Sequence, residues 1–431
     1  MNQEERRQRR QKDTKNAAII FIVFLIIVLM VVTGIVFLVG RFLMVDKAPT
    51  EPIAETEQPT ESVVATEIVE MPEVPAVDPI VEQAAEIVAG MTLEDKVAQM
   101  FVITPDALTG YSGVTAAGDT TKEAYQNCPV GGIVYMSGNL TDQEQTATML
   151  ENMQTIATEC TGLPVFLCVD EEGGDVARIA SNSAFGVENV GDMASIGASG
   201  DPQNAYIAGN TIGTYLAELG FNVDFAPVAD VLTNADNTVI GDRSFGADAQ
   251  TVAGMVTSEL QGLSAAGVYG TVKHFPGHGG TTEDSHEGAA TTERTLEELV
   301  AEEFVPFQSA IDAGVPFVMV GHISAPNVTG DNTPASLSKI MITDVLRTQM
   351  GYDGIVITDA MNMKAITEYY NSDKAAILAV SAGADMILMP ADYESAYRGL
   401  LAAVEDGTIT EERIDESVNR IVKAKLQMGQ Q

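Results

Sequence analysis

Eight short apolar runs recur along the chain between residues 100 and 390, and within each run the apolar residues are consecutive rather than alternating. Continuous runs of this length are typical of parallel strands that are buried on both faces. Consecutive runs start roughly 30 to 60 residues apart, which leaves room for the crossover helix that parallel strands need. The runs cover residues 100–104, 131–136, 164–170, 221–228, 268–275, 316–322, 354–360 and 384–390.

Helical patterns fill the stretches between the apolar runs. Thr92 with Asp95 three residues later is a helix-start signature, and Thr295 with Glu298 forms a capping box that opens a helical pattern over 295–314. Eight strand-and-helix units in one domain predict an α/β fold, a single (β/α)₈ barrel of the TIM type. A doubly wound open sheet is the alternative, but it requires a glycine-rich phosphate loop after the first strand, where this sequence has none.

The amino-terminal segment has a different pattern. Residues 1–16 carry six Lys and Arg against three acidic residues, and residues 17–40 form an uncharged, mainly apolar run. This run is long enough to cross a bilayer as a helix, and longer than the apolar region of a cleaved signal peptide. Basic residues before such a span keep the amino terminus in the cytoplasm. We therefore expect a single-pass protein of the cell membrane, with a cytoplasmic segment 1–16, a transmembrane signal anchor 17–40 and the rest of the chain outside the cell.

Residues 41–78 link the predicted span to the predicted barrel. From residue 46 onward this segment is rich in Pro, Glu, Thr and Val and contains five prolines but no glycine. Repeated proline and like charge favour an extended, hydrated spacer over a packed core. The segment is therefore predicted to be an extracellular linker that holds a barrel domain, residues 79–431, away from the membrane.

Charge and cysteine content exclude some classes of function. The net charge is −38, and a surface this acidic repels nucleic acid and anionic lipid headgroups. No nucleic-acid partner is therefore expected. The three cysteines, Cys128, Cys160 and Cys168, are odd in number and lack the spacing of metal ligands, which argues against a disulfide framework.

Titratable side chains gather where the apolar runs end. Three of the four histidines lie within "KHFPGHGGTTEDSHEG", residues 273–288. Catalytic residues of a (β/α)₈ barrel lie at the carboxyl ends of its strands, and clustered titratable groups in a cleft are typical of a functional site. The polar residues at the ends of apolar runs three, five, six and seven therefore predict an active site at one mouth of the barrel; they are Asp170, Lys273, His274, His322 and Asp359.

These motifs together resemble glycoside hydrolase family 3, and within it the single-domain β-N-acetylglucosaminidases. The resemblance covers residues 85–428 and follows the order of motifs in the family. Its pieces are "MTLEDKVAQMF", "GGIVYMSGN", "VDEEGGDVARI", "GDRSFG", "KHFPGHGGTTEDSH" and "GIVITDAMNM". Relatives often carry a second aspartate after the nucleophile, where this chain has Ala360.

The resemblance implies a role for each matching position. Asp359 would be the nucleophile that forms a covalent glycosyl-enzyme, and His286, on a mobile loop, would be the acid/base residue with Asp284 as its partner. The family uses neither a metal nor an organic cofactor, so none is expected. The residues that would hold the terminal sugar are Asp170, Arg178, Arg243, Lys273 and His274.

The chemistry of these residue types agrees with those roles. A retaining glycosidase needs one carboxylate to attack the anomeric carbon and one group to protonate the leaving oxygen. A histidine, with an ordinary pKa near 6.5, can replace the usual acid, and a nearby aspartate can orient it and stabilise its cation. His278 is expected to brace the glycine-rich loop. The expected function is that of a retaining, exo-acting β-N-acetylglucosaminidase that releases terminal β-linked N-acetylglucosamine from peptidoglycan-derived glycans.

Three alternatives remain open at this point. Within the same fold, the chain could be a β-glucosidase, or a phosphorylase, because a neutral histidine repels phosphate less than a carboxylate does. A metallohydrolase could use the three histidines with Asp284, although Pro276 and Gly277 break the helix that would align His274 with His278. A non-catalytic wall-binding module would be free to lose Asp359, His286 and Asp284, and all three are present.

Overall fold

The computed structural model describes residues 78–281, 285 and 288–429. The predicted cytoplasmic segment, the predicted span 17–40 and all but the last residue of the predicted linker 41–78 lie outside the described residues, so these assignments stay predictions. Within the described ranges, no helix has the length and apolar character needed to cross a membrane.

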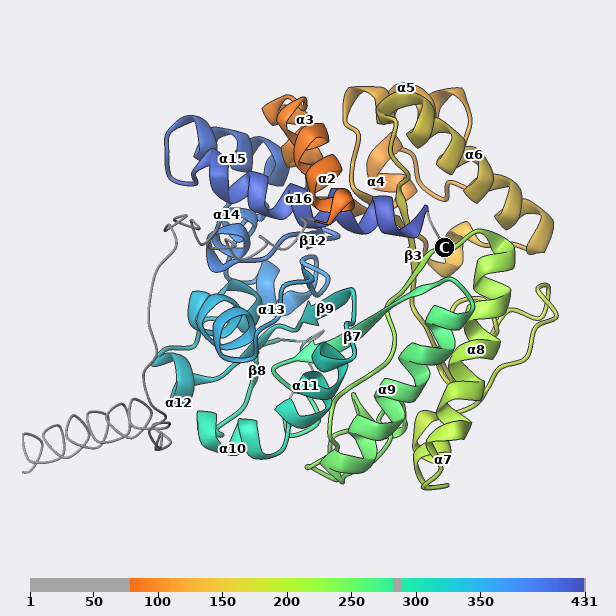
Figure 1. Cartoon of the computed structure of the whole chain (residues 1–431), viewed down its shortest axis with the longest axis vertical. Helices are drawn as coiled ribbons and strands as arrows, with labels where there is room; N and C mark the ends of the chain where they lie inside the picture. The colour runs from red at the N-terminus through yellow and green to blue at the C-terminus, as the bar shows by residue number, and fades with distance from the viewer. Residues whose placement is uncertain (1–77, 282–284, 286–287, 430–431) are drawn as a thin grey trace, which may run out of the picture. The chain divides into compact units, whose positions relative to one another are not determined.

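Eight parallel strands form the centre of the described domain, and each falls within one of the eight apolar runs (Figure 1). Their order in the sheet is β11-β9-β7-β6-β3-β2-β1-β12. A bridge between Ile357 and Met386 joins β11 to the residue before β12 and closes the sheet. The predicted (β/α)₈ barrel is thereby confirmed over the open-sheet alternative. The strands are β1 (Phe101–Ile103), β2 (Gly132–Val134), β3 (Phe166–Val169), β6 (Val223–Asp224), β7 (Tyr269–Phe275), β9 (Phe317–Val320), β11 (Ile355–Thr358) and β12 (Ile387–Leu388).

Helices follow the strands and pack around the barrel (Figure 1). The first helix of nine or more residues after each strand is, in chain order, α5 (Asp119–Asn127), α6 (Gln143–Thr161), α8 (Pro202–Leu219), α9 (Ala249–Ala265), α11 (Phe304–Asp312), the π-helix η4 (Ile340–Gln349), α14 (Ser372–Ala382) and α15 (Tyr393–Glu405). Further helices of the described residues are α2 (Pro79–Ala89), α3 (Leu93–Gln99), α4 (Pro105–Thr109), α7 (Met193–Gly197), α10 (Leu296–Ala301), α12 (Pro326–Thr329), α13 (Lys364–Thr367) and α16 (Glu411–Met428), with 3₁₀ turns η1 (Ser137–Asn139), η2 (Gly241–Arg243) and η3 (Ala335–Leu337).

The predicted helix starts are confirmed, but one predicted helix is broken. The Thr92 hydroxyl accepts a hydrogen bond from the backbone of Asp95, and Thr295 forms its capping box with Glu298. The pattern over 295–314 divides into α10 and α11, because Glu302 leaves the helical conformation (φ −137°, ψ −73°). The next side chain, Glu303, is then buried instead of remaining on a solvated helix face.

Aromatic side chains close the amino-terminal end of the barrel. Phe166 and Tyr269 stand at the first positions of β3 and β7, and both contact the ring of Phe317 at the start of β9, with centroid distances of 5.2 and 6.4 Å. The hydroxyl of Tyr269 donates to the carbonyl of Ala424 in α16. Since this end is filled by rings and a helix, the polar site lies at the opposite, carboxyl end of the strands.

Two short additional sheets lie in the loops at that carboxyl end. β4 (Glu171–Gly173) begins directly after β3 and pairs antiparallel with β5 (Val176–Ala177). β8 (Ala290–Thr291) pairs parallel with β10 (Ile323–Ser324). The β4–β5 hairpin positions part of the site described next.

Candidate active site

The polar residues predicted at strand ends lie at the same mouth of the barrel. Asp170 follows β3, and Lys273 and His274 are among the last residues of β7. His322 comes two residues after β9, and Asp359 follows β11. Lys273, His274 and His322 are buried, and Asp170 and Asp359 are partly buried. Because all eight strands are parallel, their carboxyl ends lie at the same mouth of the barrel, and these polar and charged side chains come together there.

The β4–β5 hairpin holds its own part of the site through a buried carboxylate. The side chain of Glu171 accepts hydrogen bonds from the backbone of Arg178 (2.5 Å), Ile179 and Ala180 and from the hydroxyl of Tyr215 (2.9 Å). These bonds fix the segment 178–180, which directly follows β5. As a result, the guanidinium of Arg178 lies 3.7 Å from the carboxylate of Asp170.

Lys273 is shared between two carboxylates. Its Nζ lies 2.9 Å from Oδ1 of Asp170 and 2.5 Å from Oε1 of Glu172. Burial alone would lower the pKa of Lys273, but the charges of Asp170 and Glu172 outweigh it and raise the pKa above its usual value. Lys273 therefore remains a cation at the floor of the site.

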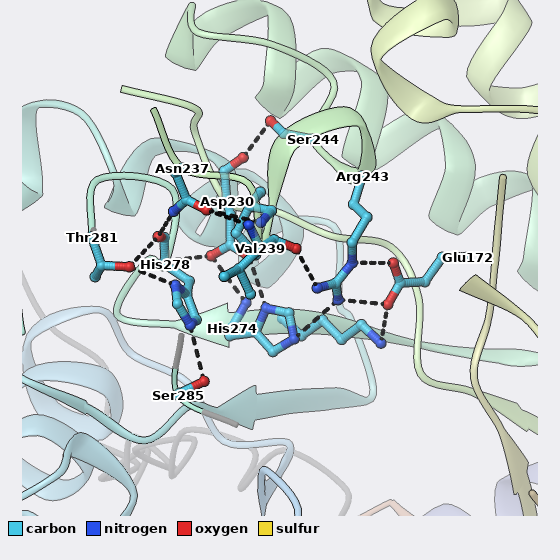
Figure 2. Close-up of polar contacts among 12 residues, drawn as sticks. Glu172, Asp230, Asn237, Val239, Arg243, Ser244, His274, His278, Thr281 and Ser285 are labelled. Atoms are coloured by element: carbon cyan, nitrogen blue, oxygen red, sulfur yellow. Dashed lines mark hydrogen bonds and ion pairs between the residues drawn. The ribbon is translucent and has the colours of Figure 1, made fainter. Parts of the chain in front are cut away.

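Arg243 binds Glu172 in a bidentate pair, which Figure 2 shows beside the histidines. Its Nε donates to Oε2 at 2.7 Å and its Nη2 to Oε1 at 2.8 Å, while Nη1 donates to the carbonyl of Val239 at 3.1 Å. Although burial opposes ionisation, Lys273 and Arg243 hold the pKa of Glu172 far below its usual range. Glu172 thus fixes two of the predicted sugar-binding cations at once.

Asp230 orients the imidazole ring of His274. Its Oδ2 lies 2.7 Å from Nδ1 of His274, and its Oδ1 accepts the backbone N–H groups of His274 (3.2 Å) and His278 (2.6 Å). Burial would raise the pKa of Asp230, but His274 and these hydrogen bonds lower it. Nε2 of His274 then faces Nη2 of Arg243 at 3.5 Å, where it can only accept, because a guanidinium has no acceptor.

Asp359 is held in its ionised form. Its Oδ1 accepts the backbone N–H of Ala360 at 2.7 Å, and its own N–H donates to the carbonyl of Val320. Burial raises the pKa of this carboxyl, yet His274, His322 and the other nearby groups lower it below its usual value overall. Asp359 is therefore a carboxylate near neutral pH, facing the cluster around His274 and Lys273.

His322 anchors the backbone beside Asp359. Its Nε2 lies 3.0 Å from the carbonyl oxygen of Ala360, and its Nδ1 lies 2.8 Å from the hydroxyl of Ser336. A carbonyl can only accept, so Nε2 of His322 carries a proton and donates it to this oxygen. The polar residue predicted at the end of run six thus fixes the segment that carries Asp359.

The predicted acid/base pair falls outside the described residues. His286 and Asp284 are not described, whereas Ser285, between them, is buried. In the described ranges, no group of three or more His, Cys, Asp or Glu side chains has an arrangement that could hold a metal ion. Because two of the ligands that a metallohydrolase would use lie outside those ranges, that alternative is not tested.

Six of the predicted site residues come together, and two further members were missed. Asp170, Arg178, Lys273, Arg243, His274 and Asp359 converge as predicted. Glu172 and Asp230 were not singled out in the sequence. Glu172 stands two residues after Asp170 in "DEEGG", and Asp230 stands two residues after the fourth apolar run. A rule that includes charged residues just beyond each run, and not only at its end, would have found both.

Comparison with known proteins places the chain in a family. Residues 92–424 match the glycosyl hydrolase family 3 N terminal domain. β-Hexosaminidase A of Pseudoalteromonas piscicida is 33% identical over 333 residues, which cover 72% of this chain and 55% of that protein. β-Hexosaminidase LpqI of Mycobacterium tuberculosis is 35% identical over 366 residues, which cover 82% of this chain and 89% of that protein.

A solved structure gives the same assignment. A glycoside hydrolase family 3 β-N-acetylglucosaminidase from Paenibacillus sp. strain FPU-7 superposes with a TM-score of 0.74 at 41% identity, covering 79% of this chain and 63% of that one. The chain therefore matches just over half of the Pseudoalteromonas protein and somewhat under two thirds of the Paenibacillus protein. The resemblance seen in the sequence motifs is confirmed: the chain belongs to glycosyl hydrolase family 3.

Proposed function

We propose that the protein is a retaining, exo-acting β-N-acetylglucosaminidase. The observation that carries the proposal is the carboxylate of Asp359, which is kept ionised at the mouth of the barrel near a buried cluster of polar groups that can bind a sugar. Relatives named β-hexosaminidase and β-N-acetylglucosaminidase support this choice of sugar. The activity, the substrate and the roles of the residues are all part of the proposal.

In the first step, an oxygen of Asp359 attacks the anomeric carbon while the bond from that carbon to the leaving oxygen breaks. Oδ1 already accepts the N–H of Ala360, so Oδ2 is the oxygen available for attack. His286, with Asp284 as its orienting partner, donates the proton that the leaving oxygen needs. In the second step, the same histidine removes a proton from water, which attacks the glycosyl-aspartate and releases the sugar with its original anomeric configuration.

Counting donors indicates how the terminal sugar is held. The ammonium of Lys273 has three N–H groups, of which Asp170 and Glu172 take two. Nε of Arg178 is buried and has no hydrogen-bond partner among the described residues. An unpartnered buried donor is costly, so we assign it, with the third N–H of Lys273, to sugar oxygen atoms, and Asp170 to a sugar hydroxyl.

The proposed source of the substrate follows from the proposed location. If residues 17–40 span the membrane as the sequence predicts, the barrel lies outside the cell, where β-linked N-acetylglucosamine occurs in peptidoglycan. We therefore propose terminal N-acetylglucosamine of peptidoglycan fragments as the natural substrate and the membrane, through the amino-terminal helix, as the attachment site.

A panel of aryl β-glycosides, assayed with the purified full-length protein in detergent, tests the proposal. We expect turnover of the N-acetylglucosaminide, with free N-acetylglucosamine as the product and a rate independent of added phosphate. Preference for the glucoside would identify a β-glucosidase. Strict dependence on phosphate, with a sugar phosphate as the product, would identify a phosphorylase.

A further inference from the structure

The carboxylate of Glu171 is enclosed by hydrogen-bond donors. Its Oε2 accepts the backbone N–H groups of Arg178 at 2.5 Å and Ile179 at 2.8 Å. Its Oε1 accepts the N–H of Ala180 at 2.8 Å and the hydroxyl of Tyr215, on the outer helix α8, at 2.9 Å. Three of the four partners are N–H groups, which cannot accept a hydrogen bond. The arrangement therefore suits an ionised carboxylate, which only accepts.

Asp224, the last residue of β6, lies beside Glu171 in a different environment. Its Oδ1 accepts the backbone N–H of Glu171 at 3.0 Å, whereas its Oδ2 is buried without a hydrogen-bond partner among the described residues. A buried charge without compensation is costly. Burial, reinforced by the charges of Glu171 and Glu259, raises the pKa of Asp224 well above its usual value, although Lys273 opposes this. Asp224 is therefore a neutral acid that accepts through one oxygen.

Both contacts of Glu171 bear on Arg178 through the backbone. β4 begins at Glu171 and pairs with β5, and residues 178–180 directly follow β5. The guanidinium of Arg178 lies 3.7 Å from the carboxylate of Asp170, and its buried Nε has no partner in the described part of the chain. Because a side chain moves with its backbone, the place of this guanidinium depends on how Glu171 is held.

We propose that Tyr215 and Asp224 are positioning residues for the terminal sugar, acting through Glu171 on Arg178. Tyr215 holds the carboxylate of Glu171 from α8, and Asp224 holds its backbone from β6. Neither residue acts by touching the substrate. The proposal rests on the proposed function, in which Arg178 binds the sugar, so its test follows sugar binding and not only the rate.

The variants change one contact of Glu171 at a time. Tyr215→Phe removes one hydroxyl, and Tyr206→Phe, a half-buried tyrosine of the same helix, is the matched control. Asp224→Asn keeps a neutral side chain with an oxygen that accepts, whereas Asp224→Ala removes the acceptor. Glu171→Gln replaces one oxygen with an amide group that must donate, where two donors already point.

The readout is kcat and KM on the aryl β-glycoside that the wild type cleaves best. We expect Tyr215→Phe and Asp224→Ala to raise KM about 10-fold, as for the loss of one buried hydrogen bond. Their kcat should stay within about threefold, because the sugar contact exists in the ground state and the transition state alike. Glu171→Gln should raise KM about 100-fold. Asp224→Asn and Tyr206→Phe should stay within about threefold of the wild type in KM.

A double-mutant cycle shows whether the effect passes through Arg178. In Arg178→Ala the sugar contact is already lost, so adding Tyr215→Phe should change kcat/KM by less than about twofold. An equal loss in both backgrounds would contradict the proposed route. Unchanged KM for Tyr215→Phe would contradict it as well, and so would a lower unfolding temperature and kcat with KM unchanged, which would show a purely structural role. Tyr215→Phe removes one oxygen atom, so the test holds even if Glu171→Gln does not fold.

Failure of the proposed function would look different. If the wild type prefers a glucoside or requires phosphate, the proposed sugar or the proposed hydrolysis is wrong, but the same cycle on that substrate still tests the route from Tyr215 to Arg178. If the wild type cleaves no aryl glycoside, the proposed function fails outright. Calorimetric titration with N-acetylglucosamine then replaces KM, and an affinity that Tyr215→Phe leaves unchanged would overturn the positioning role.

Discussion

At the scale of single residues, Glu172 holds together more of the site than any other carboxylate described above, because it pairs with both Lys273 and Arg243. It neutralises Lys273 and pairs with Arg243 through both oxygens, although no part of it needs to touch the substrate. Removing one partner of a buried ion pair leaves a buried charge uncompensated, which costs about 3–5 kcal/mol. The arrangement of Lys273 and Arg243, which we propose bind the sugar, therefore depends on this carboxylate.

The variant Glu172→Gln should lower both stability and activity. The amide cannot neutralise the two cations, so Arg243 and Lys273 shift from their positions. Since misplacement of about 1 Å can cost 100-fold in rate, we expect kcat/KM to fall by about that factor, with a rise in KM. Steady-state kinetics measures this, with the exposed Glu151→Gln of α6 as the control. Unchanged kinetics for Glu172→Gln would show that Arg243 and Lys273 do not depend on Glu172.

The acid/base assignment predicts a dependence on the leaving group. For poor leaving groups, His286→Ala should lose about 100- to 10,000-fold, while the first step on activated aryl glycosides survives because they need little protonation. Asp284→Ala should show a milder form of the same defect. Azide, which needs no general base, should partly restore turnover and yield a β-glycosyl azide. Equal losses on all leaving groups without azide rescue would move the acid/base role to Glu283 or Glu287.

At the scale of elements, the sequence predicted the strands better than the helices. Each of the eight apolar runs contains a strand, because strands buried on both faces need uninterrupted apolar residues. The single helix predicted over 295–314 is broken at Glu302. The spacing of apolar residues along the sequence does not show that Glu303 is buried in an ion pair with Arg294.

The same limit explains which site residues were missed. Asp359 and Lys273 end apolar runs, so the pattern alone marked them. Glu172 and Asp230 depend on partners that lie 71 and 44 residues away in the chain, Arg243 and His274. Their positions just beyond an apolar run mark both as candidates, but only the closed barrel shows which partner each one binds.

The α8–α9 pair buries a carboxyl that makes stability depend on pH. The helices lie side by side (Figure 1) and approach so closely that a Cβ at Gly209 would lie 2.3 Å from the carbonyl oxygen of Glu259. The Glu259 carboxyl is 1% exposed, and neither oxygen has a hydrogen-bond partner among the described residues. Burial, reinforced by the charge of Glu172, raises the pKa of Glu259 to about 8.

In the variant Glu259→Gln, the free energy of unfolding should fall less than in the wild type as the pH rises from about 4.5 to 8. Between the ordinary pKa of 4.5 and the folded-state value of about 8, the folded protein binds a proton that the unfolded chain releases. Wild-type stability therefore falls through this window, by up to about 1.4 kcal/mol for each pH unit, and this contribution is constant above it. Urea unfolding at pH 5 and pH 9 measures the difference. Parallel pH dependence of the variant and the wild type would contradict a raised pKa.

At the scale of the whole molecule, the open question is the side of the membrane on which the barrel lies. The basic residues 1–16 and the apolar run 17–40 predict a single span with the barrel outside. Protease added to intact cells should therefore release the domain after residue 45 while a cytoplasmic marker stays intact. Protection of the domain until the cells are lysed would contradict this topology and, with it, the proposed peptidoglycan substrate.

The central claim is that Asp359 forms a covalent glycosyl-enzyme, and trapping that intermediate tests it most directly. The full-length protein is incubated with an activated 2-fluoro sugar, which slows the second step, then digested and sequenced by mass spectrometry. We predict a single added glycosyl group on Asp359, in the peptide containing "TDAMNM", and no labelling or turnover for Asp359→Asn. A label on any other carboxylate would contradict the account, as would turnover by Asp359→Asn at the wild-type rate.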